Sequence, residues 1–265
     1  MIRLVGIGNT GCNLVEKLSQ YPQYNIVKID EGINIKKQNT PEDYEKNCPS
    51  LKKILGKKKQ DSYIFISASG TISGLLLRVL EQLQGNNLHV VCLVSDPGLL
   101  SPVGRLQQNL VQGVLKEYAR SGLLEKLILI DNKKIENLLG DVSLDEYYEK
   151  MNEIISYCFH SILCLKNNQP VFQTKEQEDN ISKITTIGLL DAEKNKNMFY
   201  DLKFVTQEKY FYSFSKKDMK NDKTILQKIK QDLSVEENIT KTFAVYESDK
   251  TEDFAFIETK THIVD

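Results

Sequence analysis

Residues 6–13 read Gly-Ile-Gly-Asn-Thr-Gly-Cys-Asn and carry the strongest fold signal in the sequence. The stretch follows an apolar run, 3–7, that predicts a buried strand, and it opens a predicted helix at 13–18. GxGxxG spacing lets the backbone approach a phosphate, and the free N–H groups of the helix start face the anion. Asp30 ends a second predicted strand, 24–29, where an acid can hold a ribose hydroxyl. Taken alone, these residues predict a Rossmann-like domain that binds NAD(P).

Strand and helix patterns alternate through the first half of the chain. Residues 31–60 are polar and lysine-rich, which predicts loops and one short helix. Strands are predicted at 63–68, 89–95 and 126–130, and helices at 75–84 and 105–118. This alternation indicates an α/β fold with a mostly parallel sheet, in which ligands bind at the carboxyl ends of the strands.

Composition excludes several classes of protein. The chain has 265 residues, with 35 Lys+Arg against 36 Asp+Glu, so no strong positive field exists to collect nucleic acid or an anionic membrane. Its five cysteines are scattered without a CxxC pair, which argues against a disulfide framework or a structural zinc site. No apolar run is long enough to span a membrane, and the first predicted strand begins at the N-terminus, so we expect a cytoplasmic protein.

The pattern changes after a long amphipathic helix predicted at 145–165. The rest predicts a smaller α+β domain, with strands at 183–190, 203–205, 210–214, 242–246 and 254–259 and one helix at 223–233. We therefore expect a nucleotide-binding domain at 1–142, a central helix at 143–168 and a C-terminal α+β domain at 169–265.

A second glycine cluster weakens the NAD(P) interpretation. Residues 68–74 read Ala-Ser-Gly-Thr-Ile-Ser-Gly and again lie between a predicted strand and a predicted helix. A dinucleotide needs no second phosphate loop, whereas two loops could hold a triphosphate from both sides. Neither loop is a P-loop, because GxxxxGK[ST] does not occur in the sequence.

Together these motifs resemble the tubulin/FtsZ family. Its GxGxxGxN turn is matched by residues 6–13, and its GGGTG[ST]G loop is matched in part by residues 68–74, with Ala68, Ser69 and Ile72 as departures. Ile72 is the most serious of these, since its Cβ disfavours positive φ and crowds a bound phosphate. The compactness of the chain resembles divergent phage- or plasmid-encoded tubulins of the PhuZ and TubZ type more than a housekeeping division protein.

The resemblance implies a guanine-nucleotide site built from several segments. Ser101 stands where the family has a ribose-binding glutamate, while Arg105 and Asn132 match its nucleotide-binding arginine and guanine-binding asparagine. Tyr148 and Asn152 share one helix face, where an aromatic ring can stack on a base and an amide can pair with its edge. The implied ligands are GTP or GDP with Mg²⁺, held by Gly8, Asn9, Thr10, Gly11, Cys12, Asn13, Asp30, Ala68, Ser69, Gly70, Thr71, Ile72, Arg105, Asn132, Tyr148 and Asn152.

The family completes hydrolysis with an acidic loop from the next subunit, of the form N-x-D-x-x-[DE]. Here Thr174, Glu176 and Asp179 fit that spacing, and their carboxylates could orient the attacking water. A solvated acidic turn is an equally good interpretation of these residues. A site completed by a second copy implies head-to-tail filaments of this chain, because a heterologous interface that does not close generates a filament.

Three functions follow from these observations. The leading hypothesis is a GTP-binding, tubulin/FtsZ-like cytoskeletal protein that polymerises and hydrolyses GTP. A non-hydrolysing assembly or regulatory protein with the same fold is the second, favoured by Ile72, Ser101 and the imperfect acidic loop. An NAD(P)-dependent oxidoreductase is the third, and it leaves the second glycine loop, Asn132 and the Tyr148/Asn152 pair unexplained.

Overall fold

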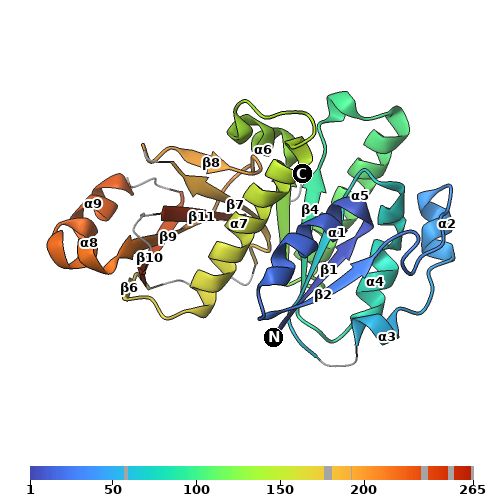
Figure 1. Ribbon diagram of the computed structural model, residues 1–265, viewed down its shortest axis with the longest axis horizontal. Helices are drawn as coiled ribbons and strands as arrows, with labels where there is room; N and C mark the ends of the chain where they lie inside the picture. Colours follow the sequence, from blue (N-terminus) through green and yellow to red (C-terminus); the bar gives the residue numbers. More distant parts are fainter. Residues whose placement is uncertain (57–58, 176–180, 192, 234–237, 250–253, 264–265) are drawn as a thin grey trace. The chain divides into compact units, whose positions relative to one another are not determined.

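The computed structural model describes residues 1–265 except 57–58, 176–180, 192, 234–237, 250–253 and 264–265 (Figure 1). The described chain divides into two compact units, Met1–Ser156 and Tyr157–Ile263. The boundary falls within helix α7, Tyr147–Asn167. Strands and helices alternate through the first unit, so the α/β class expected from the sequence is confirmed.

A parallel sheet forms the centre of the first unit, with strand order β2-β1-β3-β4-β5. Every neighbouring pair is parallel, as the alternation of strands and helices predicts, because parallel neighbours need a crossover connection. The carboxyl ends of β1 and β3 therefore open next to each other. The strands are β1 (Ile2–Ile7), β2 (Tyr24–Ile29), β3 (Ser62–Ser67), β4 (Leu88–Val94) and β5 (Lys126–Asp131).

Helices of the first unit begin where local chemistry favours a start. α1 (Gly8–Lys17) begins directly after β1 and packs against β1, β2 and β3. Ser101 and Asp131 are N-caps, since their side chains accept hydrogen bonds from backbone N–H groups of the first turn. The remaining helices are η1 (Leu18–Gln20), α2 (Pro41–Lys46), α3 (Lys52–Leu55), η2 (Thr71–Leu75), α4 (Leu76–Gln82), η3 (Pro97–Leu99), α5 (Pro102–Arg120) and α6 (Asn132–Leu139).

The second unit contains a mixed sheet with the order β7-β11-β9-β10-β6, and β8 pairs with β7. Its apolar core includes Tyr210, Tyr212, Phe243 and Val245 from the parallel pair β9 and β10, with Ile229 of α9 packed against them. The elements are β6 (Phe172–Gln173), β7 (Ile184–Leu190), β8 (Lys196–Met198), β9 (Gln207–Ser215), α8 (Lys216–Asn221), α9 (Ile225–Asp232), β10 (Thr240–Ser248) and β11 (Phe254–Thr261).

Some sequence-based expectations for this unit are wrong. Residues 203–205 form no strand, because Phe204 has φ of 52°, a left-handed conformation that extended backbone does not allow. Two helices, α8 and α9, stand where one was expected. Short strands β6 and β8 were also missed, because two or three residues carry too little periodicity to be recognised.

Within the described residues, no helix combines the length and the apolar character that crossing a membrane requires.

Candidate functional site

A cleft of about 420 Å³ lies between the two glycine loops of the first unit, which we call the first loop (residues 6–13) and the second loop (residues 68–74). This volume falls in the range of small-molecule sites, roughly 300–1,000 Å³. The first loop follows β1 and the second follows β3, so the cleft opens at the carboxyl ends of two paired strands. It is lined by Ile7, Gly8, Asn9, Thr10, Asp30, Glu31, Ser67, Ser69, Gly70, Thr71 and Ile72.

The first loop presents the start of α1 to this cleft. Gly8, the first residue of α1, has φ of 70°, a conformation that glycine adopts without steric cost. Gly11 lies behind the turn, where a Cβ would come within 2.3 Å of the Phe65 carbonyl oxygen on β3. Gly8, Asn9 and Thr10 line the cleft, and the exposed Asn13 amide donates to the Asn9 side-chain oxygen over 3.3 Å. The N–H groups of a ten-residue helix therefore begin at the cleft, as in anion sites at helix starts.

Cys12 does not line the cleft. Its buried thiol donates to the Gly6 carbonyl oxygen over 3.4 Å, beneath the turn. Burial raises the pKa of this thiol to about 11, and the negative charge of Asp30 adds to the effect. The Cys12 side chain is thus a neutral packing group under the first loop.

The second loop has an ordinary backbone. Gly70 has φ of −74°, and a 3₁₀ turn, η2, begins at Thr71. Ile72 does not have positive φ. The prediction that its Cβ would conflict with the backbone conformation is therefore wrong. Ala68 is fully buried, with its N–H bonded to the Leu93 carbonyl. Ser69 and Ile72, in contrast, both line the cleft.

Hydroxyl groups form a chain along this side of the cleft. The Ser69 oxygen lies 3.3 Å from the Ser67 oxygen and 3.0 Å from the Ser95 oxygen. Gln108, buried in α5, accepts from the Ser95 N–H over 2.8 Å and donates to its carbonyl over 3.0 Å. These three serine hydroxyls offer rotatable O–H donors to a ligand. Gln108 of α5 holds the Ser95 end of the row in place.

Two acidic residues that follow β2, Asp30 and Glu31, also line the cleft. Asp30 accepts from the Glu31 N–H over 2.8 Å, and the buried Tyr44 hydroxyl of α2 donates to the Glu31 carboxylate. Burial, and to a lesser extent Glu31, raises the pKa of Tyr44. Sequence reasoning missed Glu31 and Ser67, although Glu31 directly follows Asp30. No Lys or Arg is among the described residues that line the cleft.

The residues expected to bind the nucleoside follow β4 and β5 and do not line this cleft. Arg105 is exposed in the first turn of α5, and Ser101 caps that helix by accepting from the Gly104 N–H over 3.1 Å. Asn132 is the first residue of α6. Its side-chain oxygen is buried and has no hydrogen-bond partner among the described residues. An unpaired buried acceptor is costly, so this atom is suited to a ligand that donates a hydrogen bond.

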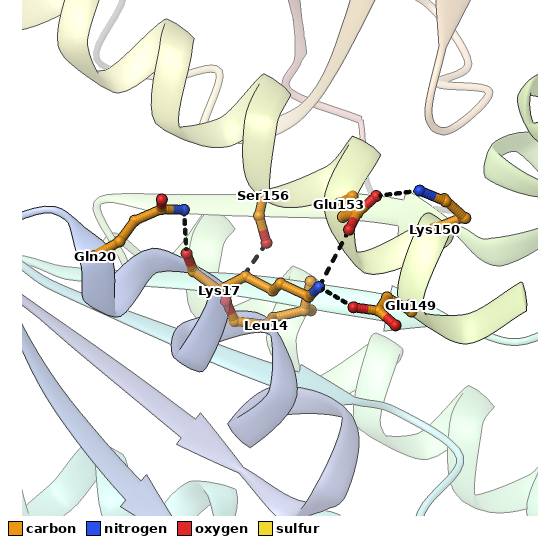
Figure 2. Close-up of polar contacts among 7 residues, drawn as sticks. All are labelled: Leu14, Lys17, Gln20, Glu149, Lys150, Glu153 and Ser156. Atoms are coloured by element: carbon orange, nitrogen blue, oxygen red, sulfur yellow. Dashed lines mark hydrogen bonds and ion pairs between the residues drawn. The ribbon is translucent and has the colours of Figure 1, made fainter. Parts of the chain in front are cut away.

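Tyr148 and Asn152 lie in the first turns of α7, which polar contacts fix to α1 (Figure 2). Lys17 pairs with Glu149 over 2.7 Å and with Glu153 over 3.3 Å. One turn further along α7, the Ser156 hydroxyl donates to the Leu14 carbonyl over 3.4 Å. This anchor holds the start of α7 beside the helix that opens at the cleft.

The Tyr148 ring is available for stacking. Its side chain is 73% exposed, and it meets the Tyr147 ring edge-on at 5.2 Å between centroids. Asn152 is half-buried one turn along the same helix. Tyr148 and Asn152, the pair expected from the i, i+4 spacing, thus provide an exposed aromatic ring and a half-buried amide on the same helix.

Only the beginning of the predicted acidic loop can be located. Thr174 accepts from the Phe243 N–H over 2.8 Å and donates to its carbonyl over 3.2 Å, beside β10. Glu176 and Asp179 lie outside the described residues.

No protein-family profile matches this sequence, and no curated protein is similar to it in sequence. Solved structures, however, share its fold over nearly the whole chain. An FtsZ dimer from M. jannaschii has a TM-score of 0.69 at 13% identity, over 98% of this chain and 88% of that one. A GTPγS-form protofilament of TubZ from Bacillus thuringiensis serovar israelensis has 0.69 at 16%, over 98% and 86%.

A third similar structure, the GTPγS-bound protofilament of CetZ2 from Haloferax volcanii, has a TM-score of 0.64 at 13% identity, over 98% of this chain and 92% of that one. Identities this low support a statement about fold alone. With the parallel sheet and the paired glycine loops described above, they show that this chain has the tubulin/FtsZ fold.

Proposed function

We propose that this chain binds a guanine nucleotide in the cleft and assembles head to tail with copies of itself. The observation that carries the proposal is that both glycine loops line one cleft at the carboxyl ends of β1 and β3. A dinucleotide-binding site would need the first loop only. The second loop supplies hydroxyl and backbone donors from the other side, which suits a chain of phosphates.

Asn132 supports guanine as the base. Guanine presents N–H donors on its Watson–Crick edge, and the Asn132 side-chain oxygen is a buried acceptor with no partner in the described part of the chain. The exposed Tyr148 ring can stack on the base, and the Asn152 amide can pair with its edge. A site that leaves buried polar groups unpaired with the wrong base discriminates against that base.

The two acidic residues suit a magnesium ion that accompanies the nucleotide. Mg²⁺ prefers oxygen ligands and is usually bound by one or two carboxylates together with phosphate oxygens and waters. Asp30 and Glu31 provide two carboxylates, and the Thr10 hydroxyl lines the same cleft. Among the described residues, no cluster of three His, Cys, Asp or Glu side chains could hold a metal by itself, so the phosphates would complete the site.

The oligomeric state of the similar structures supports self-assembly, because they are a dimer of FtsZ and protofilaments of TubZ and CetZ2. In a head-to-tail filament, the second unit of one copy would meet the nucleotide of the next. Glu176 and Asp179 would then orient the water for GTP hydrolysis, so turnover would depend on assembly.

Sedimentation and light scattering with GTP, GDP, ATP or no nucleotide, with phosphate release measured in parallel, test this function. We expect pelleting that depends on a guanine nucleotide. Phosphate release with GTP would support the hydrolysing form, and pelleting without release would support the non-hydrolysing alternative. Binding of NAD(H) without binding of guanine nucleotides would overturn the proposal.

Two variants test the assigned residues. Asn132→Ala should weaken GDP binding about tenfold or more, because the base loses a buried acceptor, whereas Asn109→Ala on the exposed face of α5 should not. Isothermal titration calorimetry measures both. Asp179→Ala should slow phosphate release and stabilise filaments, and unchanged turnover would show that another acid fills this role.

A further inference from the structure

A stripe of large apolar side chains is exposed along α5. The stripe consists of Val103, Leu106, Leu110 and Val114, whose exposed fractions are 69%, 61%, 55% and 37%. These residues recur every three or four positions, so at about 100° per residue they project from one side of the helix. Contiguous exposed apolar surface of this kind marks a place where another molecule docks.

A groove of about 160 Å³ runs beside this stripe, within the first unit. Leu110 and Val114 line it from α5, and Leu76 and Leu77 line it from α4. The volume is below the range of small-molecule sites, roughly 300–1,000 Å³. The groove therefore suits side chains of a docked protein surface better than a small ligand.

The groove side of the stripe is acidic. Glu42 and Glu45 of α2 line the groove, and we call this pair the acidic flank. Glu45 pairs with Arg78 of α4 over 3.5 Å, while Glu42 is exposed. A partner that docks here would therefore gain from positive charge beside its apolar side chains.

The other side of the stripe is basic. Val111 and Val114, which line the groove, lie on one side of Leu110 around the helix, whereas Lys116 and Arg120 lie about 80–120° around it in the opposite sense. We call Lys116 and Arg120 the basic flank. Arg120 pairs with a carboxylate of the same helix over 2.6 Å, but both side chains are more than half exposed, so this pair can be exchanged at little cost.

A second copy of this chain is complementary to these features in a parallel arrangement. In a parallel pair related by a two-fold axis along α5, each α5 can lie in the groove of the other copy, and its basic flank then faces the acidic flank of that copy. An antiparallel two-fold pair places the helices directly opposite each other and brings like flanks together. Acidic residues would then face acidic residues.

We propose that the α5 stripe and its groove form a lateral contact between two parallel copies of this chain. The groove and the nucleotide cleft share no lining residue, so this contact is separate from nucleotide binding and goes beyond the proposed function. Where the proposed head-to-tail filaments form, the contact would join two of them running in the same direction. That consequence alone rests on the proposed function.

Sedimentation velocity at increasing protein concentration, without nucleotide, tests the contact. We expect the wild-type protein to self-associate. Leu110→Lys places a charge in the middle of the stripe and should raise the dissociation constant at least about tenfold. Leu123→Lys is the matched control, because Leu123 is 61% exposed but lies beyond the end of α5, and it should associate like wild type.

Cross-linking tests the direction of the pair. In a parallel pair the two copies of Val103 lie across from each other, whereas in an antiparallel pair centred on Leu110 they lie about 21 Å apart along the helix axis. Val103→Cys treated with a bismaleimide shorter than this separation should form a covalent dimer. The wild-type protein, with its five native cysteines, gives the background.

Three outcomes would overturn the proposal. A wild-type protein that stays monomeric at every concentration has no such contact, and association that survives Leu110→Lys comes from another surface. Val103→Cys that cross-links no more than wild type contradicts the parallel arrangement. An unchanged urea-unfolding midpoint of Leu110→Lys shows that this variant is folded. None of these readouts needs a nucleotide, so a failure of this contact and a failure of guanine-nucleotide binding are distinguishable.

Discussion

The first and second loops line the same cleft, but their backbones differ. In the first loop, Gly8 has φ of 70° and Gly11 leaves no room for a Cβ. In the second, Gly70 has φ of −74°, and an added Cβ would meet nothing closer than 3.9 Å. The first loop needs Gly8 and Gly11 for geometry. The second loop needs Gly74, where a Cβ would lie 1.9 Å from the Pro41 carbonyl oxygen, but it carries side chains at Ala68, Ser69 and Ile72. The second loop therefore departs from glycine at positions whose backbone tolerates side chains, and it keeps glycine at Gly74, where the backbone does not.

Gly11→Ala should produce the largest effect. The new Cβ would lie 2.3 Å from a backbone oxygen of β3, and backbone in a paired strand cannot move aside cheaply. We expect a loss of about 3 kcal/mol in the free energy of unfolding, measured by urea denaturation. The matched variant Gly70→Ala should change it by less than about 0.5 kcal/mol. Equal losses in the two variants would remove the distinction between the loops.

Cys12 tests how tightly the first loop is packed on its buried side. A pKa raised from 9.0 to about 11 lowers the thiolate fraction about 100-fold at pH 8. Iodoacetamide should therefore modify Cys12 of the folded protein at least about 100-fold more slowly than in denaturant, as followed by mass spectrometry. Rapid modification at pH 8 would mean that the turn opens to solvent. Because the charged form is disfavoured in the folded state, stability should also fall as pH rises above 9.

Gly8→Ala tests the contact between the loops. An alanine forced into the left-handed backbone conformation of Gly8 destabilises the fold by about 1–2 kcal/mol. Its Cβ would also clash with the Ile72 methyl. We expect a total loss of about 2 kcal/mol in the free energy of unfolding. Adding Ile72→Ala should recover part of that loss, and a double-mutant cycle measures the recovered part. Additive effects would show that the two loops do not touch.

Lys17→Met should have the smallest effect, because its ion pairs anchor α1 near the surface. Both partners are well exposed, so the loss should be under about 1 kcal/mol and should shrink in high salt. The pKa of Lys17 is raised, chiefly by Glu149, and the pKa of Glu153 is lowered by Lys150 and then by Lys17. The difference from wild type should therefore be present at pH 7 and fade below pH 4.5 and above pH 10.5. A difference independent of pH would assign the loss to packing of the lysine stem.

Much of the first unit could be predicted from the sequence, because its signals are local. The five strands predicted from 3–7 to 126–130 match β1 to β5, and both glycine loops lie where a strand meets a helix. Prediction failed where no local signal exists. The Glu31 contact with Tyr44 joins separate segments of the chain, and Phe204 breaks an apparently extended run.

The sequence by itself determined the alternation of buried strands and helices, and with it a parallel sheet whose ligand edge carries two glycine loops. These features follow from periodicity and backbone chemistry, which act over a few residues. Only the tertiary structure decided that the Ile72 methyl lies against Gly8, that Asp30 and Glu31 line the same cleft, and that the Asn132 oxygen is left without a partner in the described chain. These contacts join segments far apart in sequence, and strand order and packing bring them together.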